Sequence, residues 1–147
     1  MLALAIMSPL TVLGYLLVID WVDLAPLNML PVRWTWQQRL KERISTYVPL
    51  VIIAFCFFPE HYLPAFLGAF GALVCLAQHI EAWWQPYLFG ATPDRHKQYE
   101  ISVANMTRFL PPIGSNPVPA AAHTIEGGLL LIMAASTFAA AMSLLPA

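Results

Sequence analysis

Histidine and carboxylate side chains gather at two points of an otherwise apolar chain. His79 and Glu81 lie two residues apart in one segment, and His123 and Glu126 lie three apart at the start of another. Histidine and glutamate are common general acids and bases, and burial among apolar groups favours the protonated form of a glutamate. We therefore predict that Glu81, Glu126 and His123 are the acid/base or ligand-orienting residues of this protein.

Helical spacing decides which of these side chains can meet. Residues three apart share one face of a helix, so His123 and Glu126 face the same way. Glu81 lies on a polar stripe of its own helix, whereas His79 is about 200° further round and shares a face with Trp83. One geometry directs Glu81 toward the His123 face and leaves His79 to another neighbour. The residues predicted to contact a ligand are Gln78, His79, Trp83, Trp84 and Asp20.

Three interpretations of these residues stay open. The first is a network of hydrogen bonds and ion pairs between helices that fixes packing and nothing more. The second is an acid/base or ligand-orienting site that opens to the inner leaflet. The third is a metal site, but the tight ligand spacings of metal-binding helices, such as HExxH, are missing from the sequence. We therefore predict no metal, and the sequence assigns no cofactor.

The elements that must position these residues are strongly apolar. Hydrophobic residues make up 59% of the 147 residues and charged residues 10%, whereas a soluble domain has about 25% charged residues. A soluble domain of this size could not bury so much apolar surface. The net charge of −1 argues against a nucleic-acid partner, because such partners require a basic surface. The composition predicts an all-α integral membrane protein with a single membrane domain over residues 1–147.

Four apolar runs predict a bundle of four transmembrane helices, over residues 1–20, 38–58, 62–85 and 124–146. The first run lacks the basic start of a signal peptide, so we expect it to be retained as a span. The second run is the weakest, because its apolar part, 44–58, covers about 23 Å of a hydrocarbon core of about 30 Å. We expect its helix to continue back toward Trp36.

Small residues predict where two of the spans pack closely. They recur four residues apart in the third span as Ala65/Ala69 and Gly68/Ala72, and in the fourth as Ala135/Ala139 and Ser136/Ala140. Such spacings let the backbones of membrane helices approach each other. The sequence therefore predicts a close contact between the third and fourth spans.

An amphipathic helix is predicted between these spans, over residues 92–110. Thr92 is a good N-cap and Pro93 suits the first helical position. Apolar side chains then recur at helical spacing, and they are Tyr99, Val103, Met106 and Leu110. We expect this helix to lie at the membrane interface or against the bundle.

The basic residues predict the orientation. All 7 Lys and Arg residues fall in the loops after the first and third spans, and they are Arg33, Arg39, Lys41, Arg43, Arg95, Lys97 and Arg108. The positive-inside rule makes these loops, 20–43 and 86–122, cytoplasmic, with both termini on the other side of a bacterial-type inner membrane. The tryptophans would form an aromatic belt at the same face, and they are Trp21, Trp34, Trp36, Trp83 and Trp84.

The function predicted from these features is non-catalytic. We expect a small polytopic membrane protein that binds a lipid-like or apolar ligand, or that serves as a subunit of a larger membrane complex. Its expected partners are membrane lipid, a second copy of the chain or such a complex. The alternative is an intramembrane enzyme that uses Glu/His acid–base chemistry on a membrane-soluble substrate. A proton-coupled transporter is a weaker alternative, because no inverted repeat is visible.

Overall fold

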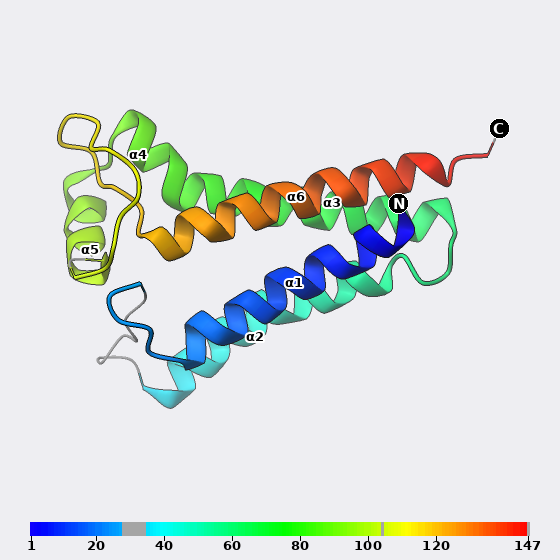
Figure 1. Ribbon diagram of the computed structural model, residues 1–147, viewed down its shortest axis with the longest axis horizontal. Coiled ribbons are helices and arrows are strands. Elements are labelled where there is room, and N and C mark those ends of the chain that lie inside the picture. Colours follow the sequence, from blue (N-terminus) through cyan, green and yellow to red (C-terminus); the bar gives the residue numbers. More distant parts are fainter. Residues whose placement is uncertain (28–34, 104, 147) are drawn as a thin grey trace.

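The computed structural model of the chain describes residues 1–27, 35–103 and 105–146. Arg33 and Trp34, which the sequence assigns to the basic loop and the aromatic belt, lie outside this range. Within it, the chain folds entirely into helices joined by loops and has no β-strand (Figure 1). The prediction of an all-helical protein is confirmed.

The helices follow one another in the order α1 (Leu2–Trp21), α2 (Trp36–Phe55), α3 (Tyr62–His79), the π-helix η1 (Ile80–Trp84), α4 (Gln85–Phe89), α5 (Pro93–Val103) and α6 (Ala121–Ser143). The segments α3, η1 and α4 continue directly into one another. They form one helical rod, Tyr62–Phe89.

Three helices are long and apolar enough to cross a membrane. They are α1 with 20 residues, the Tyr62–Phe89 rod with 28 and α6 with 23. The apolar part of α2 is shorter, Arg43–Phe55, because charged and polar residues occupy its first turns. As expected, α2 begins at Trp36, but it ends at Phe55, where 3₁₀-type bonds such as Phe57 N–H to Ala54 O tighten the chain into a turn. The structure therefore supports a helical membrane protein with three candidate spans.

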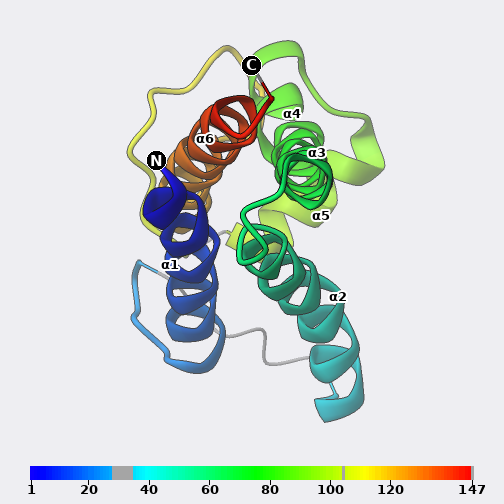
Figure 2. The same cartoon turned by 90° about the vertical axis from the view of Figure 1, so that its right-hand side faces the viewer.

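The four long helices form a ring in which each packs on two neighbours (Figure 2). α1 packs on α2 and α6, and α3 packs on the same two helices. The chain termini and the α2–α3 turn lie at one end of the bundle, which we call the terminal end (Figure 1). α4, α5 and the segments around α5 lie at the opposite end, which we call the α5 end.

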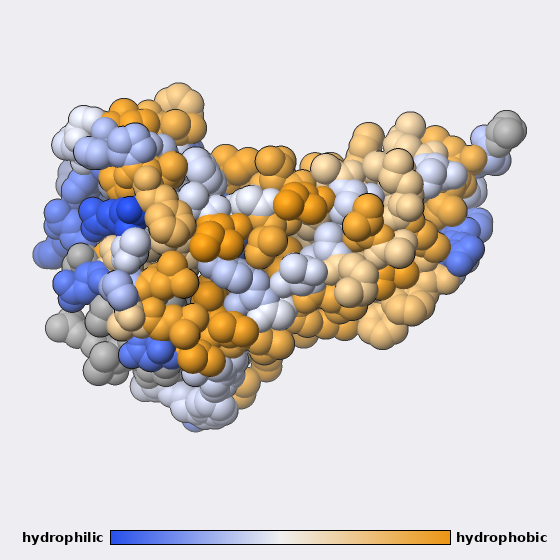
Figure 3. Space-filling model, viewed as in Figure 1, coloured by the Kyte–Doolittle hydropathy of each residue, from blue (hydrophilic) through white to orange (hydrophobic). Residues whose placement is uncertain are grey.

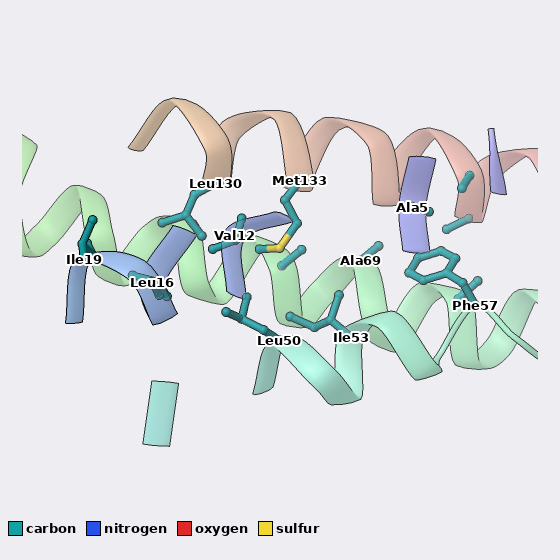
Figure 4. Packing of buried hydrophobic residues seen from close by; sticks show 14 of the residues in the cluster. Ala5, Val12, Leu16, Ile19, Leu50, Ile53, Phe57, Ala69, Leu130 and Met133 are labelled. Atoms are coloured by element: carbon teal, nitrogen blue, oxygen red, sulfur yellow. The ribbon is translucent and has the colours of Figure 1, made fainter. Parts of the chain in front are cut away.

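Large side chains of α1, α2 and α6 meet small residues of α3 in the core. Val12, Leu50 and Met133 point toward one another between these helices (Figure 4). The small residues of α3 are all buried, and they are Ala65, Gly68, Ala69 and Ala72. A Cβ at Gly68 would lie 2.8 Å from the Cβ of Cys56 and 2.8 Å from the Phe57 ring. The absent side chain therefore brings the end of α2 directly against α3.

The contact predicted between the third and fourth spans is present as the packing of α3 on α6. The predicted small residues of α6 take different positions around the helix. Ala140 is buried, whereas Ala135 is exposed. Ser136 faces α1, where its Oγ lies 2.8 Å from the Oγ of Ser8.

The outer faces of the bundle are apolar. Hydrophobic residues cover the length of the helices, and hydrophilic residues gather at the two ends, mostly at the α5 end (Figure 3). The exposed apolar side chains come from all four long helices and include Leu17, Ile52, Leu67, Phe70 and Ile132. An exposed apolar surface of this extent is typical of contact with lipid.

Candidate functional site

An acid–histidine cluster, formed by His79, His123 and Glu126, lies where the end of α3 meets the beginning of α6. The Glu126 carboxylate lies between two imidazole rings: Oε2 is 3.3 Å from Nδ1 of His123, and Oε1 is 3.7 Å from Nδ1 of His79. The side chain of His79 is 4% exposed, that of Glu126 15% and that of His123 24%. The cluster is therefore enclosed at His79 and reaches the surface through His123.

Two neighbouring helices anchor the first turns of α6, which carry the acid. The hydroxyl of Tyr15 on α1 donates to the carbonyl oxygen of Ala122 at 2.7 Å. The Nε2 atom of His79 on α3 lies 3.0 Å from the carbonyl oxygen of His123. These bonds reach carbonyls of consecutive residues from two different helices, so they fix the rotation of α6 about its axis.

A glycine makes room for the rod beside α6. A Cβ at Gly127 would lie 2.8 Å from Nε1 of Trp84 and 3.0 Å from Nε2 of His79. Real Cβ contacts essentially never come as close as the first of these distances. The absence of a side chain at this position therefore allows both rings to lie against the backbone of α6.

The hydrogen bond of His79 determines which of its ring nitrogens carries a proton. A carbonyl oxygen can only accept, so Nε2 of His79 carries the hydrogen. When the ring is neutral, Nδ1 presents a lone pair to the Glu126 carboxylate, which is also an acceptor. The close approach is favourable when His79 is an imidazolium or when Glu126 is protonated. The contact between the two side chains is an ion pair when His79 is charged.

An aromatic ring covers one face of His123, the most exposed member of the cluster. The ring of Trp83 is stacked on His123, with centroids 3.5 Å apart and planes at 17°. Tyr99 of α5 meets the same indole edge-on, at 5.0 Å and 90°. Burial raises the pKa of the Tyr99 phenol, and the nearby Arg95 acts in the opposite direction. The phenol therefore stays neutral at physiological pH and packs as an uncharged ring.

A proline explains the π-helix η1, which carries Trp83. Pro86 has no N–H to donate to the carbonyl of Ala82 four residues earlier, and its ring crowds that carbonyl. The helix widens here, and the N–H of Gln85 bonds to the carbonyl of Ile80 five residues back. Single π-turns of this kind are frequent at functional sites.

The same proline leaves the carbonyl of Glu81 without a backbone donor. In an α-helix it would accept from Gln85, whose N–H is used in the π-type bond. In a π-helix it would accept from Pro86, which has no N–H. Arg95 of α5 fills this gap, with one guanidinium nitrogen 2.7 Å from the carbonyl oxygen of Glu81 and 3.5 Å from that of Ala82.

Asp20, which the sequence predicts to contact a ligand with Gln78 and His79, belongs to a separate polar group between α1 and α2. It pairs with Arg43 and accepts a hydrogen bond of 2.7 Å from the Tyr47 hydroxyl. The Arg43 side chain is 8% exposed, and its guanidinium lies 5.5 Å above the centre of the Trp21 ring. This group ties the ends of α1 and α2 together.

The structure brings together some of the predicted site residues and separates others. Glu126, His123 and His79 meet in the cluster, with Trp83 and Trp84 beside them. The side chains of Gln78 and Glu81, in contrast, are exposed on the outside of the rod. The structure thus differs from the expected approach of Glu81 to His123, because the rod turns its His79 face toward α6.

The small-residue stripe of α3 would have indicated this orientation. Ala65, Ala72 and His79 follow one another at seven-residue intervals, so they share a face, and all three are buried. Two further residues of the site, Tyr15 and Arg95, were missed by sequence reasoning. Arg95 could have been found from Pro86, whose missing N–H predicts a carbonyl in need of a donor.

Comparisons with known proteins leave this site to be interpreted from its geometry. No protein-family model matches the chain, and no significant match is found among the curated proteins or the solved structures compared with it. In the described part of the chain, no group of three or more His, Cys, Asp or Glu side chains is arranged to hold a metal ion.

Proposed function

We propose that the chain is an integral membrane protein with four crossings, in which α2 is the fourth. The apolar part of α2, Arg43–Phe55, is short. Burial of the stems of its basic side chains at the interface would complete the crossing. The positive-inside rule supports a cytoplasmic α5 end in a bacterial-type inner membrane, with the terminal end on the other side. In this arrangement α5 lies at the inner membrane surface.

We infer that the acid–histidine cluster carries out acid–base chemistry on a membrane-soluble substrate. The observation that carries this inference is the Glu126 carboxylate, 15% exposed, within 3.3 Å and 3.7 Å of two imidazole nitrogens. A carboxylate this close to two imidazoles can exchange protons with them and with a substrate placed beside it. A network that serves packing alone has no need of an opening at His123.

The three residues take different roles in this chemistry. Glu126 is the general acid and base that exchanges a proton with the substrate. His123 exchanges protons with water: a proton arrives at its Nε2, and the proton on its Nδ1 passes to Glu126. His79 is a positioning residue, because its Nε2 is bound to the carbonyl of His123 and its Nδ1 stabilises the carboxylate. Each turnover that gives a proton to the substrate is thus balanced by one proton taken from water.

Hydrogen exchange into apolar molecules tests this function and identifies the substrate in the same experiment. The protein in lipid nanodiscs is incubated in D₂O with a total apolar extract of the expression host, and the extract is analysed by mass spectrometry. We expect deuterium to enter a carbon position of one apolar molecule with the wild type and with the surface variant His96→Gln. Glu126→Gln, which keeps the size of the side chain, should abolish the incorporation. Equal incorporation by wild type and Glu126→Gln, or none above a protein-free blank, would overturn the proposal.

A binding or subunit function is a second candidate, favoured by the exposure of Gln78 and Glu81. Both side chains lie on the outside of a helix that we propose to span the membrane. Polar groups that face lipid are costly unless another helix supplies a hydrogen-bond partner. A second copy of the chain would supply one. Native mass spectrometry of the gently extracted protein should then show a dimer that is lost in Gln78→Leu/Glu81→Leu, and a monomer in both samples would exclude this candidate.

A further inference from the structure

We propose that Arg95 on α5 is a positioning residue of the acid–histidine cluster, acting through the π-helix and Trp83. The inference rests on the acid–base function proposed above. Arg95 binds the carbonyls of Glu81 and Ala82, in the segment that carries the indole stacked on His123. It therefore controls the surroundings of the cluster from outside the bundle.

The π-helix lacks a backbone donor for one of its own carbonyls, so an outside donor is needed to hold its shape. Pro86 takes the backbone donor away from the carbonyl of Ala82 and, once the helix has widened, from that of Glu81. A carbonyl without a backbone donor, such as that of Glu81, binds water or another donor, and movement toward water would rotate the segment. The guanidinium of Arg95 pairs with the Glu81 carbonyl at 2.7 Å and lies 3.5 Å from the Ala82 carbonyl. It thereby fixes the widened turn in one conformation.

α5 also contacts a side chain of the same segment, the indole of Trp83. Arg95 and Tyr99 are four residues apart, so they share a face of α5. Tyr99 meets the Trp83 ring edge-on at 5.0 Å, while the Trp83 ring is stacked on His123 at 3.5 Å. α5 thus contacts the backbone of the π-helix through Arg95 and the Trp83 indole through Tyr99.

The contacts of α5 with this segment affect the exposed histidine of the cluster. His123 is the most exposed member of the cluster, at 24% of its side chain, and Trp83 covers one face of its ring. With α5 in place, the indole limits the approach of water and substrate to this imidazole. Loss of the Arg95 contacts with the π-helix would let the indole move and expose the His123 imidazole. The position of α5 against Trp83 thus sets the rate of proton exchange at His123.

Hydrogen exchange at the imidazole C2 position, measured by mass spectrometry for each histidine, tests this role. The full-length protein in nanodiscs is compared as wild type, Arg95→Gln, Arg95→Lys and Lys97→Gln. The last variant removes the same charge from an exposed position on the same helix. We expect Arg95→Gln to raise the exchange rate of His123 several-fold. Arg95→Lys should restore part of the wild-type rate, and Lys97→Gln should match the wild type.

A double-variant experiment separates this mechanism from a general loss of structure. Pro86→Ala returns an N–H donor to the segment, so Arg95→Gln should change His123 exchange less in that background than in the wild type. An equal change in both backgrounds would overturn the carbonyl mechanism, and no change in either would overturn the positioning role itself. The acid–base function is judged separately by Glu126→Gln. Suppose that Glu126→Gln loses deuterium transfer while Arg95→Gln leaves His123 exchange unchanged. This result would overturn the positioning role of Arg95 and support the acid–base function.

Discussion

Gly127 and Trp84 fit together so closely that the glycine cannot carry a side chain without movement of the indole. A Cβ at Gly127 would lie 2.8 Å from the Trp84 ring nitrogen. The same Cβ would lie 3.0 Å from Nε2 of His79, the atom that bonds to the carbonyl of His123. One missing side chain on α6 thus allows the α3–α4 rod to place two site residues against the α6 backbone.

Gly127→Ala is therefore expected to destabilise the protein by about 1–3 kcal/mol, the usual cost of overfilling a packed interface. Gly128→Ala is the matched control, because a Cβ there meets nothing within 4 Å. The control should be neutral or stabilising by up to about 1 kcal/mol, since alanine favours a helix more than glycine does. Thermal unfolding of both variants in the same detergent measures the difference. Equal melting temperatures would show that the interface is looser than described.

A second pair of glycines tests the packing of α2 on α3. A Cβ at Gly68 would lie 2.8 Å from both the Cys56 Cβ and the Phe57 ring and 3.2 Å from the Ile53 carbonyl, whereas one at Gly14 meets nothing within 4 Å. We expect Gly68→Ala to cost about 1–3 kcal/mol of stability, because backbone cannot move aside as a flexible side chain can. Gly14→Ala should cost nothing. The two variants can be compared by unfolding in sodium dodecyl sulfate, and a stable Gly68→Ala would contradict the close approach of the two helices.

The ion pair between Asp20 and Arg43 is expected to contribute through the penalty of breaking it. Asp20→Asn leaves the Arg43 guanidinium, 8% exposed, without its anion, and loss of a buried partner costs several kcal/mol. Asp20 itself is 26% exposed, so we expect a smaller loss of roughly 2 kcal/mol. The double variant Asp20→Leu/Arg43→Met should recover part of this loss. The outcome that contradicts the account is a double variant less stable than Asp20→Asn.

The proposed topology predicts that the α2–α3 turn and the α5–α6 connection lie on opposite sides of the membrane. Single cysteines at Pro59 and Ser115, both exposed, can be introduced after Cys56 and Cys75 have been replaced by alanine. An impermeant thiol reagent applied to intact cells should label Pro59→Cys and leave Ser115→Cys unlabelled until the membrane is opened. Labelling of both positions in intact cells would contradict the single crossing that we place between them.

The limits of α5 show what local signals in the sequence can predict. Thr92 and Pro93 predict the start of this helix, and the Thr92 hydroxyl accepts the N–H of Arg95 at 3.4 Å. The predicted end at residue 110 is wrong, because the helix ends at Val103. Beyond it, the N–H of Thr107 bonds to the carbonyl of Pro26 at 2.8 Å. This bond to a distant segment accompanies the departure of the chain from the helix, and no local pattern predicts it.

The candidate site was predictable in its members and not in its arrangement. His123 and Glu126 share a face by spacing alone, and both belong to the cluster. The partner on α3 was harder to choose, because Glu81 and His79 lie on different faces of one helix and each face carries polar residues. Packing decides between them: the face that bears the small residues turns toward α6. Pro86 then widens the helix, and a regular helical period does not describe the residues before it.

The position of α6 in the ring has a consequence for biosynthesis. It is the last of the described helices to leave the ribosome, and it packs on both α1 and α3. Tyr15 and His79, which anchor its first turns, are therefore made before their acceptors exist. During synthesis the earlier helices therefore lack these hydrogen-bond partners until α6 has been made.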